Sequence, residues 1–168
     1  MPAGRGKFPP RGRRKRARVK IYFSCSLTGG RKDEAVYALI VDHLLAEGHE
    51  VLTAHLARPE VMAREPVVEP REVFRRDIEW IEQCEALVAE VTTPSHGVGY
   101  EIAYALGLGR PVLCCYRSGT PVSKMILGND SPTLLVAEYR EGNELPSRID
   151  TFLARCPRPA QPPRGPGA

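Results

Sequence analysis

The stretch ALVAEVTTPSHGVGYEIAYALGLGRPVLCCYR, residues 86–117, decides the fold of this chain. It begins with an apolar run over 86–91 and ends with a second, mostly apolar run over 110–117. Such runs, without polar alternation, are typical of strands covered on both faces of a parallel sheet. Between them, apolar residues recur at helical spacing over 95–109. The stretch therefore predicts two parallel strands joined by a helix.

The same alternation continues on both sides of this unit. Apolar runs predict three further strands, and periodic segments bounded by glycine or proline predict the helices between them. The expected strands cover 19–25, 50–56 and 133–139, and the expected helices cover 32–47, 71–84 and 143–155, with a short helical piece at 123–128. We expect one α/β domain, a doubly wound five-stranded parallel sheet of the flavodoxin or Rossmann-like kind, with strand order 2-1-3-4-5.

Charge is distributed unevenly along the chain. The 168 residues have a formal net charge of +4, yet nine of the 24 Lys and Arg side chains lie in residues 1–20, which contain no Asp or Glu. Residues 21–168 therefore have 15 basic and 20 acidic side chains. We expect a disordered basic tail over 1–17, the α/β domain over 18–156 and a disordered Pro-rich tail over 157–168. Because the domain itself is acidic, nucleic acid is an expected partner of the basic tail alone.

Cysteine usage and hydropathy indicate the cellular environment. The five cysteines have no spacing typical of a metal site, so we predict neither a metal nor a cofactor. An odd number of cysteines without a signal peptide favours a reducing cytoplasm, and the basic N-terminal segment leaves a nuclear location open. No apolar run approaches the roughly 18 residues that a membrane span needs, so no membrane association is expected.

Three loops are expected at the carboxyl edge of the sheet, where doubly wound folds bind their ligands. They are SCSLTGGR (24–31), TAHLARPE (53–60) and TTPSHGVGYE (92–101). The glycine pair in the first loop opens a helix and suits a phosphate, although it matches neither common nucleotide-binding glycine motif. The third loop leads into Glu101, the one charged side chain between residues 91 and 109. A carboxylate in such apolar surroundings is either a helix-start residue that faces the helix dipole or a reactive group in a cleft.

Asp77 is the second candidate carboxylate. In a helix over 71–84 it lies on or beside the inward face, on one stripe with Trp80 and Ile81. Two carboxylates from different elements at one cleft are typical of glycosidic-bond chemistry, in which one attacks the anomeric carbon and the other assists the leaving group. A structural pairing of Asp77 with Arg76 remains the alternative.

Three long segments together resemble a known enzyme family. YFSCSLTGGRKD, RRDIEWIEQCEALVAEVTTPSHGVGYEIAYALGLGRPVLC and SKMILG are similar to the 2′-deoxynucleoside 5′-phosphate N-hydrolases of the nucleoside 2-deoxyribosyltransferase superfamily, over about residues 19–155. The resemblance implies hydrolysis of a 2′-deoxynucleoside 5′-monophosphate to free base and 2-deoxyribose 5-phosphate. It also implies that Glu101 is the nucleophile that forms a covalent intermediate, that Asp77 assists the departing base, and that Tyr22 supports Glu101.

The same resemblance implies a set of substrate contacts and a dimer. The implied substrate-binding residues are Tyr22, Phe23, Ser24, Cys25, Ser26, Leu27, Thr28, Gly29, Tyr37, His55, Ser95, Gly97 and Glu101. Ser123, Lys124 and Met125 match a segment that reaches into the neighbouring subunit's active site, which implies a homodimer with shared sites.

Two positions depart from the family pattern. Cys25 stands where the family usually has glycine, and Thr28 stands where it usually has arginine, so base preference and the requirement for a 5′-phosphate stay open. The alternatives are a nucleoside 2-deoxyribosyltransferase that uses the same nucleophile, a nucleotide-binding module without turnover, and a protein that acts through nucleic acid bound by its basic tail.

Overall fold

The protein, seen in a computed structural model, is described over residues 18–27, 32–61 and 67–157. Five parallel strands form one sheet in the order β2-β1-β3-β4-β5, which confirms the predicted fold class and strand order. The strands are β1 (Lys20–Ser24), β2 (Glu50–Val51), β3 (Ala86–Glu90), β4 (Val112–Arg117) and β5 (Leu134–Tyr139).

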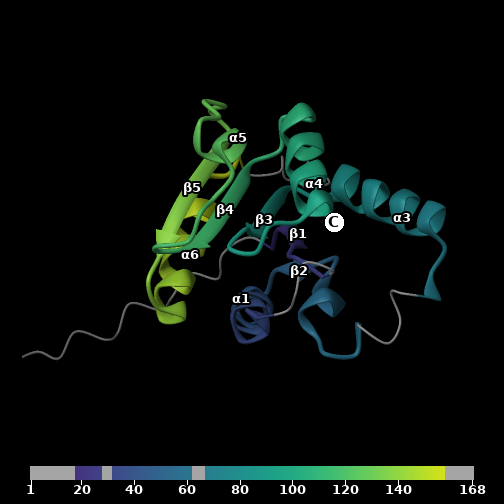
Figure 1. Ribbon diagram of the computed structural model, residues 1–168, viewed down its shortest axis with the longest axis horizontal. Coiled ribbons are helices and arrows are strands. Elements are labelled where there is room, and N and C mark those ends of the chain that lie inside the picture. The colour runs from purple at the N-terminus through teal and green to yellow at the C-terminus, as the bar shows by residue number, and fades with distance from the viewer. Residues whose placement is uncertain (1–17, 28–31, 62–66, 158–168) are drawn as a thin grey trace, which may run out of the picture.

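Helices cover both faces of this sheet (Figure 1). α1 (Glu34–Ala46) and α6 (Leu145–Arg155) pack on one face, and α3 (Pro70–Gln83) and α4 (His96–Gly107) pack on the other. Each face of the sheet has its own apolar core, as the uninterrupted apolar strands predict. The neighbouring thiols of Cys114 and Cys115 lie in different cores because successive strand residues point to opposite faces.

The predicted second strand is too long. Residues 50–56 were expected to be extended, but β2 ends at Val51 and a 3-10 helix, η1 (Ala54–Ala57), follows. The physical reason is Thr53, whose buried hydroxyl accepts a hydrogen bond from the Phe23 N–H (2.8 Å) and donates one to the Phe23 carbonyl (2.7 Å). This hydroxyl occupies the edge of β1 that a longer β2 would have paired with, so His55 lies in η1 and not in a strand.

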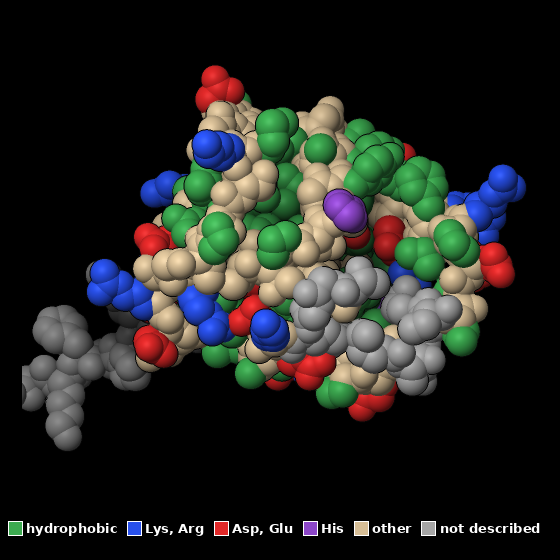
Figure 2. Space-filling view, in the orientation of Figure 1, with side chains coloured by type: hydrophobic (Ala, Val, Ile, Leu, Met, Phe, Trp, Pro, Cys, Tyr) green, Lys and Arg blue, Asp and Glu red, His purple; other side chains and the backbone are tan. Residues whose placement is uncertain are grey.

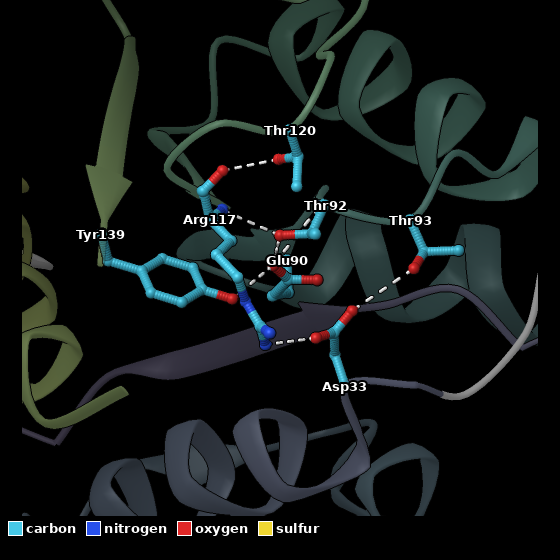
Figure 3. Close-up of polar contacts among 7 residues, drawn as sticks. All are labelled: Asp33, Glu90, Thr92, Thr93, Arg117, Thr120 and Tyr139. Atoms are coloured by element: carbon cyan, nitrogen blue, oxygen red, sulfur yellow. Dashed lines mark hydrogen bonds and ion pairs between the residues drawn. The ribbon is translucent and has the colours of Figure 1, made fainter. Parts of the chain in front are cut away.

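A polar network ties the carboxyl ends of the strands together (Figure 3). Glu90, at the end of β3, accepts hydrogen bonds from the Thr92 hydroxyl and from the Tyr139 hydroxyl of β5 (2.9 Å). Arg117, at the end of β4, makes an ion pair with Asp33, which immediately precedes α1. The network thereby fixes the start of α1 and the loop after β3 on the edge where the candidate residues lie.

Candidate active site

The carboxylate of Glu101 is held by two hydroxyl groups of one strand. Glu101 lies in the second turn of α4, and its Oε1 accepts a hydrogen bond from the Tyr22 hydroxyl at 3.0 Å. Its Oε2 accepts a hydrogen bond from the Ser24 hydroxyl. Tyr22 and Ser24 are two residues apart on β1, so their side chains share the face that α4 covers. The sheet and the helix thus bring together residues that are almost 80 positions apart in the sequence.

Burial dominates the electrostatics of this group. Burial raises the pKa of Glu101, while the hydrogen bonds from Ser24 and Tyr22 oppose that rise. The pKa of Tyr22 is also raised, first by burial and then by the charges of Glu101 and Asp77. Tyr22 therefore stays a neutral donor at physiological pH, which is what a hydroxyl that holds a carboxylate requires.

Asp77 reaches the same site from α3. Its charge acts on both Tyr22 and Glu101 and raises the pKa of each, which places the two carboxyl groups in one electrostatic environment. Its Oδ1 accepts a hydrogen bond from the Nε of Arg76 at 2.9 Å. Their side chains are only 20% and 25% exposed, so this ion pair is shielded from solvent and belongs to the site.

Aromatic rings flank the ion pair. The guanidinium carbon of Arg76 lies 5.0 Å from the centre of the Trp80 ring, within the range of a cation–π contact. The His55 ring meets Trp80 edge to face, with 5.7 Å between ring centres. A planar base has apolar surface to pack on here, next to a positive charge and a carboxylate.

Small residues form the start of α4, the helix that carries Glu101. The Ser95 hydroxyl accepts a hydrogen bond from the Val98 N–H (3.5 Å) and so caps the start of α4. A Cβ added to Gly97 would have the Ser95 hydroxyl 3.8 Å away as its sole close neighbour among the described residues, so protein packing alone does not demand glycine there. Among the described residues, the Ser26 hydroxyl is buried without a hydrogen-bond partner, as expected for a group that meets a ligand. Thr28 and Gly29 lie outside the described residues.

Other predicted residues do not point into this cluster. Phe23, Cys25 and Tyr37 are buried in the core on the α1 side of the sheet, and Leu27 packs against that core. Phe23 and Tyr37 contact each other there, with ring centres 6.1 Å apart. Contact between a substrate at Glu101 and these residues would have to involve their backbone.

The segment predicted to serve a second subunit lines a cavity together with Ser95 and α4. Ser123 caps the short helix α5 (Lys124–Leu127) by accepting a hydrogen bond from the Met125 N–H. Met125 is 84% exposed and Leu127 is 51% exposed. Figure 2 shows hydrophobic side chains gathered between α5 and α4, where a cavity of about 390 Å³ lies.

The amino-acid sequence around this site matches a known protein family. Residues 21–142, which include Tyr22, Asp77 and Glu101, match the family described as Nucleoside 2-deoxyribosyltransferase. The chain belongs to that family.

Relatives within the nucleoside 2-deoxyribosyltransferase family agree with this assignment. The chain is 40% identical to the 5-hydroxymethyl-dUMP N-hydrolase of Rattus norvegicus over 82% of this chain and 86% of that protein. It is 39% identical to the 5-hydroxymethyl-dUMP N-hydrolase of Homo sapiens over 83% and 82% of the two chains. Among solved structures, a CMP N-glycosidase of Clostridium botulinum aligns with this chain with a TM-score of 0.60. The alignment covers 79% of this chain and 98% of that one at 16% identity, so it supports the fold alone.

Sequence reasoning missed two features of this family member's site. Ser24 was expected to contact the substrate, but its hydroxyl donates a hydrogen bond to Glu101. Arg76 was considered only as a structural partner of Asp77. Its positive charge also acts on Glu101 and Tyr22 and lowers the pKa of both. The two-residue spacing of Tyr22 and Ser24 was the signal for the first, since it places both on one face of a strand.

The described residues offer no evident metal site. Within them, no group of three or more His, Cys, Asp or Glu side chains gathers closely enough to hold an ion. None of the helices in the described ranges is long and apolar enough to cross a bilayer.

Proposed function

We propose that this protein hydrolyses the N-glycosidic bond of 2′-deoxynucleoside 5′-monophosphates, releasing the free base and 2-deoxyribose 5-phosphate. The observation that carries the proposal is the partly buried Glu101 carboxylate, held by two hydroxyl groups, together with the charge of Asp77 acting on it. The named activity of relatives at about 40% identity supports the same reaction, and makes 5-hydroxymethyl-dUMP the first substrate to test.

The proposed course is a double displacement. A Glu101 oxygen attacks C1′ of the sugar, the bond from C1′ to the base breaks, and its electron pair leaves with the base nitrogen. In this proposal the departing base takes a proton from the carboxyl group of Asp77, which Arg76 holds in place, and Asp77 takes a proton back from the water that attacks next. Water then attacks C1′ and breaks the bond to Glu101, which returns as a carboxylate while the sugar phosphate leaves with retained configuration.

The direct test is release of free base by wild type, Glu101→Gln and Asp77→Asn. We expect Glu101→Gln to lower kcat by at least about a thousandfold, because an amide is not a competent nucleophile. Asp77→Asn should lower it less for bases that leave easily than for bases that leave poorly. Thermal unfolding of each variant checks the fold, and a Glu101→Gln variant that is folded and fully active would exclude the mechanism.

The substrate class follows from the loops at the carboxyl edge. We propose that Ser26, Ser95 and the glycine loop contact the sugar and the 5′-phosphate. Comparing deoxynucleotides, the matching nucleosides and ribonucleotides tests this, and equal kcat/KM with and without the phosphate would contradict it.

A second candidate activity is transfer of the deoxyribosyl group to another base, since the family is described as nucleoside 2-deoxyribosyltransferases. Both activities share the first step and differ in whether water or a base attacks the intermediate. Adding an acceptor base during turnover separates them, because a transferase then forms a new nucleotide. Binding without release of base would favour a non-catalytic module.

We also propose a homodimer in which Ser123, Lys124 and Met125 of one subunit complete the site of the other. The exposure of Met125 and Leu127 beside the apolar cavity between α4 and α5 supports this, because large exposed apolar side chains cluster at interaction sites. Lys124 is a suitable donor to a 5′-phosphate.

Residues 18–156 are proposed as the catalytic domain, with a cytoplasmic or, through the basic segment, nuclear location. Cys84, Cys114, Cys115 and Cys156 are free thiols, as suits a reducing compartment. A chain trimmed to residues 18–156 should keep its hydrolase activity. Salt-sensitive DNA binding that survives this trimming would contradict the assignment of nucleic acid to the tail.

A further inference from the structure

Ser24 ends β1 directly beneath the carboxylate of Glu101. It is fully buried, and its hydroxyl donates a hydrogen bond to Glu101 Oε2, while Tyr22 serves the other oxygen, Oε1. The Ser24 hydroxyl is therefore engaged with the nucleophile. A hydroxyl has a single proton to donate, so the one that Ser24 gives to Glu101 is not available to a substrate.

We propose that Ser24 is a positioning residue that acts through Glu101: with Tyr22 it keeps the partly buried carboxylate ionised and fixes its plane for attack on the sugar. The effect on ionisation stands on the structure alone, whereas the effect on turnover rests on the proposed function.

The first part follows from the groups that face Glu101. Burial disfavours its charged form, and the nearby carboxylate of Asp77 disfavours it further. Against these stand the hydroxyl groups of Ser24 and Tyr22 and the more distant charge of Arg76, and the Ser24 hydrogen bond is the largest of the three opposing influences on the pKa of Glu101. Without Ser24, the balance moves toward the protonated acid, which is not a nucleophile.

The second part follows from geometry. A glutamate side chain has three rotatable bonds, and one hydrogen bond leaves its carboxylate free to turn about that contact. Two donors at alternate positions of one strand hold both oxygens, and the strand itself is hydrogen-bonded between β2 and β3. The carboxylate plane is thus set by the sheet.

The test compares Ser24→Ala with Ser24→Thr, which keeps a hydroxyl. Thr53→Val is the matched control, because the Thr53 hydroxyl bonds to the backbone of the neighbouring Phe23 and does not bond to Glu101. The carboxyl of Glu101 is titrated by NMR in glutamate-labelled protein without substrate, with Glu101→Gln identifying its signal. The acid limb of kcat/KM against pH is measured in parallel.

We expect Ser24→Ala to raise the pKa of Glu101 by about one to two pH units. This shift corresponds to the free energy that a hydrogen bond to a charged group contributes. The acid limb of its kcat/KM profile should move up by the same amount. Ser24→Thr and Thr53→Val should keep the wild-type midpoint. Circular dichroism and thermal unfolding establish that each variant is folded.

An unchanged Glu101 titration in folded Ser24→Ala overturns the inference, whatever the activity. An equal shift in Thr53→Val overturns it as well, because the effect would then come from strand disturbance. If the titration moves as expected but no variant or wild type releases a base, the proposed function fails and the role of Ser24 in ionising Glu101 stands.

Discussion

Arg76 is the residue at which this site gains a fixed positive charge. It lies between Asp77, to which its Nε donates at 2.9 Å, and the face of the Trp80 ring. An arginine in this position restrains the carboxylate and offers a cation to a base that leaves with an electron pair. Its charge also lowers the pKa of Glu101, which assists ionisation of the proposed nucleophile.

Replacing Arg76 with glutamine should lower kcat/KM about tenfold at neutral pH, since a hydrogen bond to a charged group is lost. The acid limb of the pH profile should move upward, because the pKa of Glu101 rises when the nearby cation is removed. Steady-state rates between pH 5 and 9 measure both effects. Arg75→Gln is the control, because Arg75 is an exposed neighbour on the same helix. An equal change in both variants would assign the effect to the surface charge of α3.

At the scale of elements, the carboxyl ends of β3, β4 and β5 are joined by the network around Glu90 (Figure 3). Glu90 is fully buried, and burial raises its pKa. Within the described residues, its Oε1 has two hydroxyl donors and its Oε2 has no hydrogen-bond partner. Burial therefore disfavours the charged form of Glu90, and the hydrogen bonds from Thr92 and Tyr139 oppose that effect.

Stability should depend on pH through Glu90. A carboxyl whose pKa is raised in the folded state contributes most below its ordinary pKa of 4.5, and this contribution is lost as pH rises toward the raised value. Glu90→Gln removes this titration. The free energy of unfolding of the variant should therefore rise by about 1–2 kcal/mol relative to that of wild type as pH rises above 4.5.

Urea unfolding across this pH range measures the difference. Glu138→Gln on β5 is the matched control, because Glu138 is exposed. A constant difference between Glu90→Gln and wild type at every pH would show that folding leaves the pKa of Glu90 unchanged.

At the scale of the whole molecule, the chain presents Glu101 and Asp77 on the α3–α4 side of the sheet and an apolar surface between α4 and α5. The proposed dimer covers this surface and places the segment with Ser123 and Met125 in the partner's site. The consequence is that two inactive chains can form one complete site between them.

Mixing subunits tests this arrangement. One chain carries Glu101→Ala, and the other carries Ser123→Ala with Met125→Ala. After dissociation and random reassociation, about a quarter of the sites should be complete, because half of the dimers are mixed and each mixed dimer has one intact site. Activity after mixing measures this fraction.

The control mixes Glu101→Ala with Asp77→Asn, which lie in the same subunit's half of the site and should not complement each other. Recovery in the control as well, or a monomer by light scattering at working concentration, would contradict the shared site.

The sequence by itself determined the layers of the fold and the candidate residues of the site. Uninterrupted apolar strands alternating with periodic helices specify a covered parallel sheet, because periodicity is a local property of the chain. The apolar surroundings of Glu101 and the helical spacing of Asp77 then indicated these two carboxylates as candidates. The role of Tyr22 was implied by the resemblance to a known family.

Only the tertiary structure decided which groups meet. The Ser24–Glu101 hydrogen bond joins residues 77 positions apart, and the Thr53 hydroxyl ends β2 by bonding to a strand 30 positions away. The side chains of Tyr37 and Cys25 lie in the core on one face of the sheet, whereas Glu101 lies on the opposite face. Such contacts depend on how helices pack on the sheet, and side-chain partners across that interface leave no periodic signal in the sequence.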